Sequence, residues 1–203
     1  MTCPSHYFDQ DPSTSHAYGQ YEIFFGGVNF IFETDRSVFS RQHMDPGSQL
    51  LLKTVLKDWE DRPLEVLDLG TGIGVLAVVL ARLRPLFQVT ASDINERAVR
   101  LAAKNAVRAG VKDRVRTLAL DGVPPGSYDL VLTNPPIRAG KETVYGLFGQ
   151  VAAALAPGGS FYVVIRVKQG ADSARRELER LFDGLETMAR SKGYHVLRAW
   201  KEE

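Results

Sequence analysis

Cysteine is almost absent from the sequence, and long apolar runs are missing from it. One cysteine, Cys3, stands among 203 residues, so an intramolecular disulfide is excluded and a thiolate metal site would lack partners. No apolar run approaches the roughly 20 residues that span a bilayer. The first residues, MTCPSHYFDQ, have neither a basic start nor an apolar stretch, so no secretory signal is expected. These features favour a cytoplasmic protein that uses no metal and no membrane.

The size and composition are those of a single globular protein. A chain of 203 residues, 44% apolar and 24% charged, is long enough to bury a core and short for two domains of ordinary size. The net charge of +1 is unevenly distributed, since residues 1–61 carry 4 Lys or Arg against 9 Asp or Glu, and residues 62–203 carry 21 against 15. A polyanion would therefore meet the larger part of the chain, although a solvated charged surface explains the same numbers.

The first 61 residues are expected to form an N-terminal extension that packs on the rest. Residues 1–19 are polar and rich in Ser, Asp and Pro, which predicts no regular structure. The alternating apolar runs YEIFF and VNFIFETD flank Gly26-Gly27, a pattern typical of a β-hairpin. Asp45 before Pro46 is typical of a helix start, and the apolar residues that follow at helical spacing predict a helix over 46–60.

From residue 62 to 203 the pattern alternates strand and helix, which predicts one α/β domain. Five buried strands are expected at 64–70, 87–93, 114–120, 128–134 and 161–167, and the last two runs, 185–190 and 194–200, are expected to form an antiparallel edge. The helix after the fifth strand is expected over 171–183, closed by Gly184. The fold class is therefore α/β and Rossmann-like, with a mostly parallel sheet and helices on both faces. Ligands in such folds bind beyond the carboxyl ends of the strands.

The first of these strands ends in a glycine-rich turn that suits a cationic ligand. Its sequence is Asp68-Leu69-Gly70-Thr71-Gly72-Ile73-Gly74, and glycines allow a backbone to turn tightly and approach a ligand. The spacing lacks the third glycine of the dinucleotide fingerprint, and Asp68 would repel a pyrophosphate. The sulfonium and ammonium groups of S-adenosylmethionine fit better. A plain turn between strand and helix is the alternative.

The next two strands end in carboxylates that could hold a nucleoside. Asp93 is placed to accept both hydroxyl protons of a ribose, and Ile94 to lie against the adenine face. A nicotinamide-dependent enzyme would use the same carboxylate. Asp121-Gly122 follows the third strand, where the carboxylate could accept from the adenine amino group. A surface turn explains Asp121 nearly as well.

The fourth strand ends in Asn134-Pro135-Pro136, the candidate catalytic residues. Methyl transfer to an amine depends mainly on positioning. The Asn134 side-chain oxygen and the Pro135 carbonyl could accept from the two N–H bonds of an amino group and turn its lone pair toward the methyl. Consecutive prolines restrict the backbone here and leave these carbonyls without local donors. A simple turn after a strand is the alternative.

Three segments, taken in this order, resemble a known family. VLDLGTGIGVLAVVLA, ASDINERAV and TNPPIRAGK are similar to the methyltransferase small domain, and above all to bacterial small-subunit ribosomal RNA guanine-N2 methyltransferases and their archaeal relatives. The resemblance also covers HYF near residue 6, TDRSVFS at 34–40, DPGSQLLL at 45–52 and KQGA at 168–171. It therefore spans nearly the whole chain.

The resemblance implies a class I methyltransferase with S-adenosylmethionine as cofactor and S-adenosylhomocysteine as product. The implied target is guanine N2 of 16S ribosomal RNA, on free RNA or the small ribosomal subunit, with no indication of the oligomeric state. The family's cofactor-binding positions correspond to the strand ends already described, with Asn134 shared between cofactor and catalysis. They are Asp68, Gly70, Thr71, Gly72, Gly74, Asp93, Ile94, Asp121 and Gly122.

One position departs from the pattern of amino-methyltransferases. Many of them have an aromatic residue after the two prolines that stacks on the target base, and here that residue is Ile137. An apolar side chain stacks less well, so stacking could come from Phe39 or Tyr145 instead, although Phe39 could equally belong to the core. Four cations near the motif could clamp phosphates, or be scattered surface charges: Arg138, Lys141, Arg166 and Lys168.

Three further functions remain open. The same chemistry could serve a protein glutamine side chain or adenine N6 in RNA or DNA, because Asn-Pro-Pro suits all of these acceptors. A nucleotide-binding regulator without catalysis would have no use for Asn134-Pro135-Pro136. A nicotinamide-dependent dehydrogenase is the function least consistent with the sequence, because of the glycine spacing and Asp68.

Overall fold

The first described element is a β-hairpin in the computed structural model, which describes residues 18–35, 44–135 and 140–202. Strand β1 (Tyr18–Phe25) pairs antiparallel with β2 (Val28–Asp35), and Phe25 lies opposite Val28 across a two-residue turn. Gly26 and Gly27 in this turn have φ of +58° and +81°, which glycine adopts without steric cost. The predicted hairpin is confirmed.

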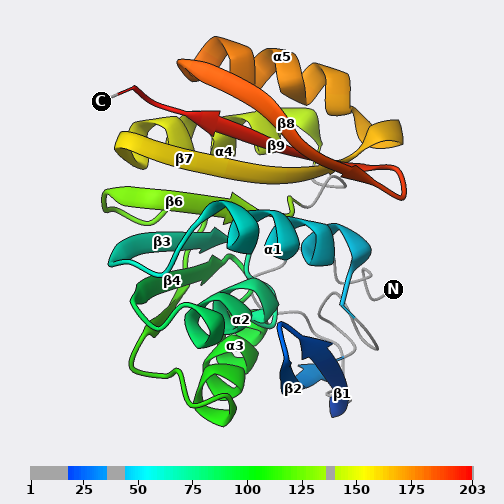
Figure 1. The fold of residues 1–203 in the computed structure, drawn as a ribbon, viewed down its shortest axis with the longest axis vertical. Helices are drawn as coiled ribbons and strands as arrows, with labels where there is room; N and C mark the ends of the chain where they lie inside the picture. The colour runs from blue at the N-terminus through cyan, green and yellow to red at the C-terminus, as the bar shows by residue number, and fades with distance from the viewer. Residues whose placement is uncertain (1–17, 36–43, 136–139, 203) are drawn as a thin grey trace, which may run out of the picture.

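Helix α1 (Pro46–Asp58) follows and is also as predicted, two residues shorter at its end. Asp45 caps it, because its Oδ2 accepts a hydrogen bond from the Ser48 backbone N–H at 3.0 Å. The face that α1 buries carries Leu51, Leu52 and Val55, all without solvent exposure. Figure 1 shows α1 lying across the sheet, with the hairpin at the same side of the molecule.

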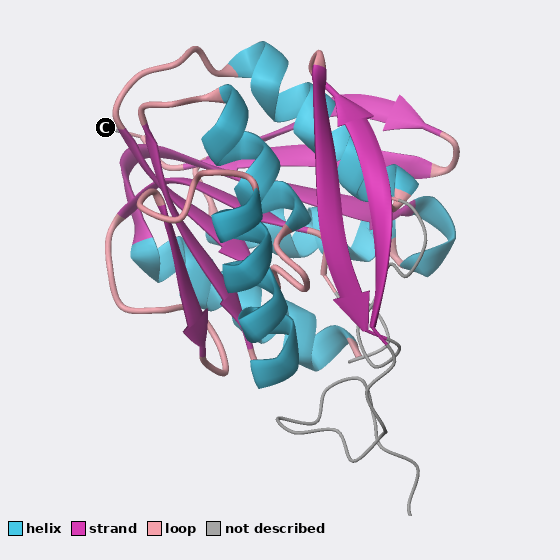
Figure 2. Cartoon of the chain, turned by 90° about the horizontal axis from the view of Figure 1, so that it is seen from below, coloured by secondary structure: helices cyan, strands magenta, loops and turns pink. Residues whose placement is uncertain are grey.

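The remaining elements form one seven-stranded sheet covered by helices (Figures 1 and 2). The order across the sheet is β5-β4-β3-β6-β7-β9-β8; the pairs from β5 to β7 are parallel, and β9 pairs antiparallel with both β7 and β8. The strands are β3 (Leu64–Leu69), β4 (Phe87–Asp93), β5 (Val115–Ala119), β6 (Tyr128–Thr133), β7 (Leu155–Arg166), β8 (Gly184–Ser191) and β9 (Tyr194–Trp200). The helices are α2 (Val75–Leu83), α3 (Glu96–Arg108), α4 (Lys141–Ala154) and α5 (Ala171–Leu181), with a 3₁₀ turn, η2 (Val167–Gln169).

Each face of the sheet has its own hydrophobic core. On one face α1, α2, α3 and the hairpin pack in a single cluster that includes Phe32, Leu52 and Leu80. On the other face α4 and α5 pack through residues such as Phe148 and Leu178. The order of the strands reverses beside β3, between β4 and β6, and ligands bind at such a point in folds of this kind. The predicted fold class is confirmed.

Two boundaries differ from the prediction for reasons of tertiary packing, beyond shifts of one or two residues elsewhere. Strand β7 begins at Leu155, not near residue 161, because Tyr128 already pairs with Leu155 before the register shifts. Gly184 does not terminate α5, which ends at Leu181, but opens β8. A Cβ at Gly184 would lie 2.0 Å from the Trp200 ring, so the glycine is required by packing and not by a helix end.

The hairpin and α1 share a core cluster with the sheet, and the domain division after residue 61 stays a prediction. No helix within the described ranges is long and apolar enough to cross a membrane.

Candidate active site

The loop after β3 leaves its first glycines open to a ligand. Gly70, Gly72 and Gly74 all have positive φ, of +74°, +56° and +87°, a backbone conformation that favours glycine. A Cβ at Gly70 or Gly72 would meet nothing within 4 Å, whereas one at Gly74 would lie 3.0 Å from the Ala102 Cβ. The first two glycines therefore border open space, and the third allows α2 to pack closely against α3.

Asp68 lies beneath this loop and is fully buried. Its Oδ2 accepts from the Thr71 hydroxyl at 2.6 Å and from the Ala77 backbone N–H at 3.1 Å. Its Oδ1 is buried and has no hydrogen-bond partner within the part of the chain that the structure describes. Burial raises the pKa of Asp68 to about 7, against the two hydrogen bonds, and the nearby charge of Asp93 adds to the rise. An oxygen left in this state suits a cationic or hydrogen-donating ligand.

Asp93, at the end of β4, holds the glycine-rich loop with its carboxylate. Its Oδ2 accepts from the Gly72 N–H and its Oδ1 from the Asn95 N–H, both at 2.9 Å. The backbone oxygen of Ser92 accepts from two further N–H groups of the loop. Burial raises the pKa of Asp93, and its backbone hydrogen bonds oppose that rise. Ile94 next to it is half-buried. Each Asp93 oxygen keeps acceptor capacity for a second donor.

Asp121 and Gly122 follow β5 on a loop that α4 anchors. The Gln150 side-chain oxygen accepts from the Val123 N–H at 2.9 Å, and a Cβ at Gly122 would lie 2.4 Å from that oxygen. Gly122 has φ of +96°, so the turn requires glycine for both reasons. Asp121 itself is exposed. The anchoring role of Gln150 carried no signal in the sequence.

Asn134 lies directly after β6, and its side-chain amide is held from one side. Its Nδ2 donates to Asp45 Oδ2 at 2.9 Å and to Ser48 Oγ at 3.0 Å. Since both amide protons are used in this way, the amide oxygen is the atom left to accept from another molecule. Pro135 is buried. Pro136, Ile137 and Arg138 lie outside the described residues, as does Phe39.

A small cavity adjoins Pro135 on the side of α4 and β7. Lys141 and Tyr145 line it together with Ile165 from the end of β7. The Tyr145 hydroxyl donates to Ser173 Oγ at 2.8 Å, and its ring packs on Phe148 with centroids 5.8 Å apart. Tyr145 therefore lies beside Pro135, with its hydroxyl already paired.

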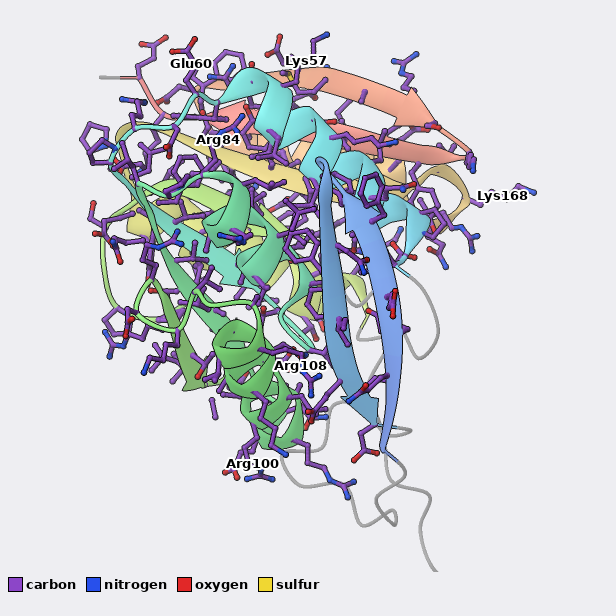
Figure 3. All side chains as sticks on the ribbon, turned by 60° about the horizontal axis from the view of Figure 1, so that its bottom comes forward. Lys57, Glu60, Arg84, Arg100, Arg108 and Lys168 are labelled. Atoms are coloured by element: carbon purple, nitrogen blue, oxygen red, sulfur yellow. The ribbon has the colours of Figure 1, made fainter. Side chains whose placement is uncertain are left out.

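Arg166, the last residue of β7, and Lys168, just after it, are both exposed. The Arg166 guanidinium lies 5.3 Å from the centre of the Tyr194 ring, a cation–π distance, and Lys168 belongs to η2. Figure 3 shows Lys168 projecting away from the body of the molecule. The Tyr194 hydroxyl in turn donates to Asp45 Oδ1 at 3.5 Å, which connects this edge to the residues around Asn134.

Asn105 on α3 connects the hairpin to the glycine-rich loop. Its Oδ1 accepts from the Glu33 N–H at 2.8 Å, and its Nδ2 donates to the Glu33 carbonyl at 3.1 Å and the Ile73 carbonyl at 2.8 Å. The side chain is almost fully buried. The sequence pattern places Asn105 on an amphipathic helix and gives no sign of this contact, because its partner strand is 72 residues away.

These residues fit a nucleoside that carries a positive charge. Asp68 and Asp93 lie on the neighbouring strands β3 and β4, and the open glycines lie in the loop directly after β3. Among the described residues there is no group of three or more His, Cys, Asp or Glu able to hold a metal ion. The donor and acceptor set thus matches S-adenosylmethionine, whose sulfonium and ammonium are cationic, better than it matches a pyrophosphate.

Comparison with known proteins identifies the family. The family model described as methyltransferase small domain matches residues 29–198. The chain is 35% identical over 201 residues to the uncharacterized protein YbxB of Bacillus subtilis (strain 168), covering 97% of this chain and 98% of that one. It is 36% identical over 173 residues to the ribosomal RNA large subunit methyltransferase G of Pseudomonas syringae pv. syringae (strain B728a), covering 81% of this chain and 45% of that one.

A solved structure has the same fold. It is that of the T. thermophilus 16S rRNA N2 G1207 methyltransferase (RsmC) in complex with AdoMet and guanosine, with a TM-score of 0.82 and 27% identity over 94% of this chain. This chain covers 52% of that protein, so it spans about half the length of the ribosomal RNA methyltransferases that it matches.

Proposed function

The chain belongs to the methyltransferase small domain family, with the class I fold and S-adenosylmethionine as cofactor, and on this premise we propose that it methylates an exocyclic amino group of ribosomal RNA. The target that the observations support best is guanine N2 of small-subunit (16S) RNA. The structural relative that shares this fold over 94% of the chain is a 16S rRNA N2 methyltransferase solved with guanosine. The large-subunit relative makes 23S RNA the nearest competing substrate.

We assign the cofactor to the carboxyl ends of β3, β4 and β5. Gly70 and Gly72 would let the backbone approach it, Asp93 would accept from its ribose, and Ile94 would cover its adenine. The cofactor supplies the methyl group, activated by the sulfonium charge. The other residues assigned to this pocket are Asp68, Thr71, Gly74, Asp121 and Gly122, with Asn134 at its border.

Asn134 and Pro135 would hold the amino group of the acceptor. The single observation that carries this proposal is the orientation of the Asn134 amide, whose Nδ2 is bound to Asp45 and Ser48. The side-chain oxygen is then left to accept from one N–H of the acceptor, and the Pro135 carbonyl to accept from the other. These two bonds would fix the nitrogen for in-line attack. Because the N–H becomes acidic as the new bond forms, no strong general base is required. Pro136 would restrict the backbone after them.

The RNA itself would be held by cations near this motif. Lys141 lines the cavity beside Pro135, and Arg166 and Lys168 are exposed at the end of β7; Arg138 completes the proposed set. Phosphate contacts of this kind position a polynucleotide without reading its sequence. Phe39 and Tyr145 are the candidates for stacking on the target base.

The decisive experiment supplies the protein with labelled methyl donor and 30S subunits or 16S RNA that lack the modification. After nuclease digestion, we expect the label in N2-methylguanosine. Label in 23S RNA, in N6-methyladenosine or in protein glutamine would identify the other acceptors. Cofactor binding without transfer to any of them would support a regulator and contradict the proposed enzyme.

The variant Asn134→Ala tests the assigned role of the amide. We expect the dissociation constant for S-adenosylmethionine to change little, and kcat to fall by roughly 100-fold or more, because the acceptor loses one of its two positioning bonds. Calorimetry measures the first quantity and methyl transfer to RNA the second. Unchanged turnover would contradict the role.

A further inference from the structure

The amino end of α1 contacts Asn134, although the two lie far apart in the chain. Asp45 and Ser48 are 89 and 86 residues from Asn134, and both accept from its Nδ2. The same Asp45 oxygen, Oδ2, also accepts from the Ser48 backbone N–H at 3.0 Å. The cap of the helix and the anchor of the amide are therefore one atom.

This arrangement defines which way the Asn134 amide faces. A carboxylate has acceptors and no donor, so the amide oxygen of Asn134 cannot take the place of its nitrogen beside Asp45 without placing two acceptors in contact. Ser48 alone would allow either orientation, because a hydroxyl both donates and accepts. Asp45 is thus the residue that selects the orientation, and Ser48 binds the second amide proton.

The surrounding backbone is built for this contact. A Cβ at Gly47 would lie 2.8 Å from Asp45 Oδ2 and 2.9 Å from the Tyr194 ring, so only glycine allows Asp45 to reach over the first turn of α1. Tyr194 donates to the other oxygen, Oδ1, at 3.5 Å. Both oxygens of the Asp45 carboxylate are engaged, which restricts its rotation.

We propose that Asp45 and Ser48 are positioning residues that hold the Asn134 amide with its oxygen toward the acceptor amine. This inference rests on the proposed function of Asn134. Without the anchor, the amide would sample both orientations, and in the reversed one it presents N–H donors to the N–H groups of the acceptor. Turnover falls in proportion to the loss of the correct orientation and position, while the cofactor pocket on β3 and β4 is unchanged.

The test separates the cap from the anchor by using three substitutions. Asp45→Ser keeps a residue that caps helices well but shortens the side chain, so the bond to Asn134 is lost. Asp45→Asn keeps both the helix cap and the bond to Asn134, because a single side-chain oxygen accepts from the Ser48 N–H and from Asn134 Nδ2. Ser48→Ala removes only the second acceptor. Leu56→Ala, at the other end of the same helix, is the matched control, since Leu56 packs on the core and lies away from Asn134.

Three measurements on each variant give the result: the rate of methyl transfer, the cofactor dissociation constant and the melting temperature. Steady-state methyl transfer to RNA should show kcat lowered roughly 10- to 100-fold in Asp45→Ser and by a smaller factor in Ser48→Ala, which keeps Asp45. The cofactor dissociation constant should stay within about twofold of wild type in both. Asp45→Asn should restore most of the turnover. Leu56→Ala should lower the melting temperature at least as much as Asp45→Ser does, with kcat close to wild type. The proposal would be overturned if Asp45→Ser had the kcat of the wild type. It would also be overturned if Asp45→Ser and Leu56→Ala lowered kcat by the same factor.

A structural readout keeps this test independent of the substrate. The side-chain amide of Asn134, identified in a ¹⁵N–¹H NMR spectrum by its absence in Asn134→Ala, should give proton signals that are shifted downfield by the bonds to Asp45 and Ser48 and that exchange slowly with water. In Asp45→Ser those signals should broaden or exchange faster, and in Asp45→Asn they should persist. If these protons exchange with water in the wild type as fast as those of an exposed asparagine, the anchor does not exist. If it is held but no RNA is methylated, the proposed function fails and the anchor stands.

Discussion

At the scale of single residues, Asp68 predicts how cofactor binding depends on pH. In the folded protein its pKa is about 7, and in an unfolded chain a carboxyl titrates near 3.8. Between these values folding takes up a proton, so the contribution of Asp68 to stability decreases as the pH rises through that window. A cationic group near the unpaired Oδ1 would favour the ionised form, so cofactor binding should release this proton.

We therefore expect the affinity for S-adenosylmethionine to increase roughly tenfold from about pH 5.5 to about pH 7.5. The raised pKa of Asp93 acts in the same direction. Asp68→Asn keeps an oxygen for Thr71 and Ala77 and does not titrate, so its affinity should vary less with pH. Calorimetry at several pH values measures both. An identical pH dependence in the variant and the wild type would mean that Asp68 does not respond to the cofactor.

The sequence identifies individual residues well where a strand ends and poorly where a contact spans the chain. The positions of Asp93 and Asn134 follow from strand ends, because parallel strands place their carboxyl ends on one edge of the sheet. Asp45 was identified as a helix cap, and its bond to Asn134 was not, since nothing local links residues 89 positions apart. Asn105 and Gln150 were missed for the same reason.

At the scale of elements, hydrophobic periodicity and turn residues locate most helices and strands. The hairpin turn at Gly26-Gly27 and the Asp45 cap of α1 both appear as predicted, because glycine and aspartate meet local backbone requirements. The errors occur where a glycine serves tertiary packing. Gly184 was expected to end α5, and it is instead required by the Trp200 ring that covers it. A glycine in the sequence does not show whether it is needed for a left-handed backbone conformation or for a close contact with another side chain.

The connection between the hairpin and the glycine-rich loop predicts a loss of both stability and affinity in Asn105→Ala. That change leaves the Glu33 N–H and the Ile73 carbonyl without their partner. Unpaired buried backbone groups are costly, so the free energy of unfolding should fall by about 2–4 kcal/mol. Cofactor affinity should fall as well, because Ile73 lies within the loop.

Denaturant unfolding and calorimetry measure these two effects. Asn29→Ala is the matched control, since its Nδ2 donates at 3.2 Å to Glu22 in an exposed pair on the same hairpin. That variant should remain within about 0.5 kcal/mol of wild type. If the two alanine variants have equal stability, Asn105 does not fasten the hairpin to the loop.

At the scale of the whole molecule, the N-terminal extension supports both halves of the candidate site. The end of β2 is bound through Asn105 to the glycine-rich loop, and the start of α1 is bound to Asn134. The extension therefore does more than cover the core. The sequence predicted that it packs on the sheet but could not show that it orients groups at the carboxyl ends of the strands, because those contacts exist only after the chain has folded.

The distribution of charge over the molecule leads to the last prediction. The excess of positive charge in residues 62–203 includes Arg166 and Lys168, exposed on the same edge as Asn134. If they contact RNA phosphates, Arg166→Gln/Lys168→Gln should weaken RNA binding at low salt. The slope of the logarithm of affinity against the logarithm of salt concentration should fall by about 1.4, since each contact with a single strand contributes about 0.7.

The matched control is Lys57→Gln/Lys112→Gln, which removes the same charge at the opposite edge of the sheet. Lys57 lies in the last turn of α1, and Lys112 precedes β5 at its amino end. Filter binding of a 16S RNA fragment over a range of salt concentrations should leave the slope of this control close to wild type. If both pairs change the slope equally, the RNA responds to net charge alone, and the assignment of phosphate contacts to Arg166 and Lys168 is wrong.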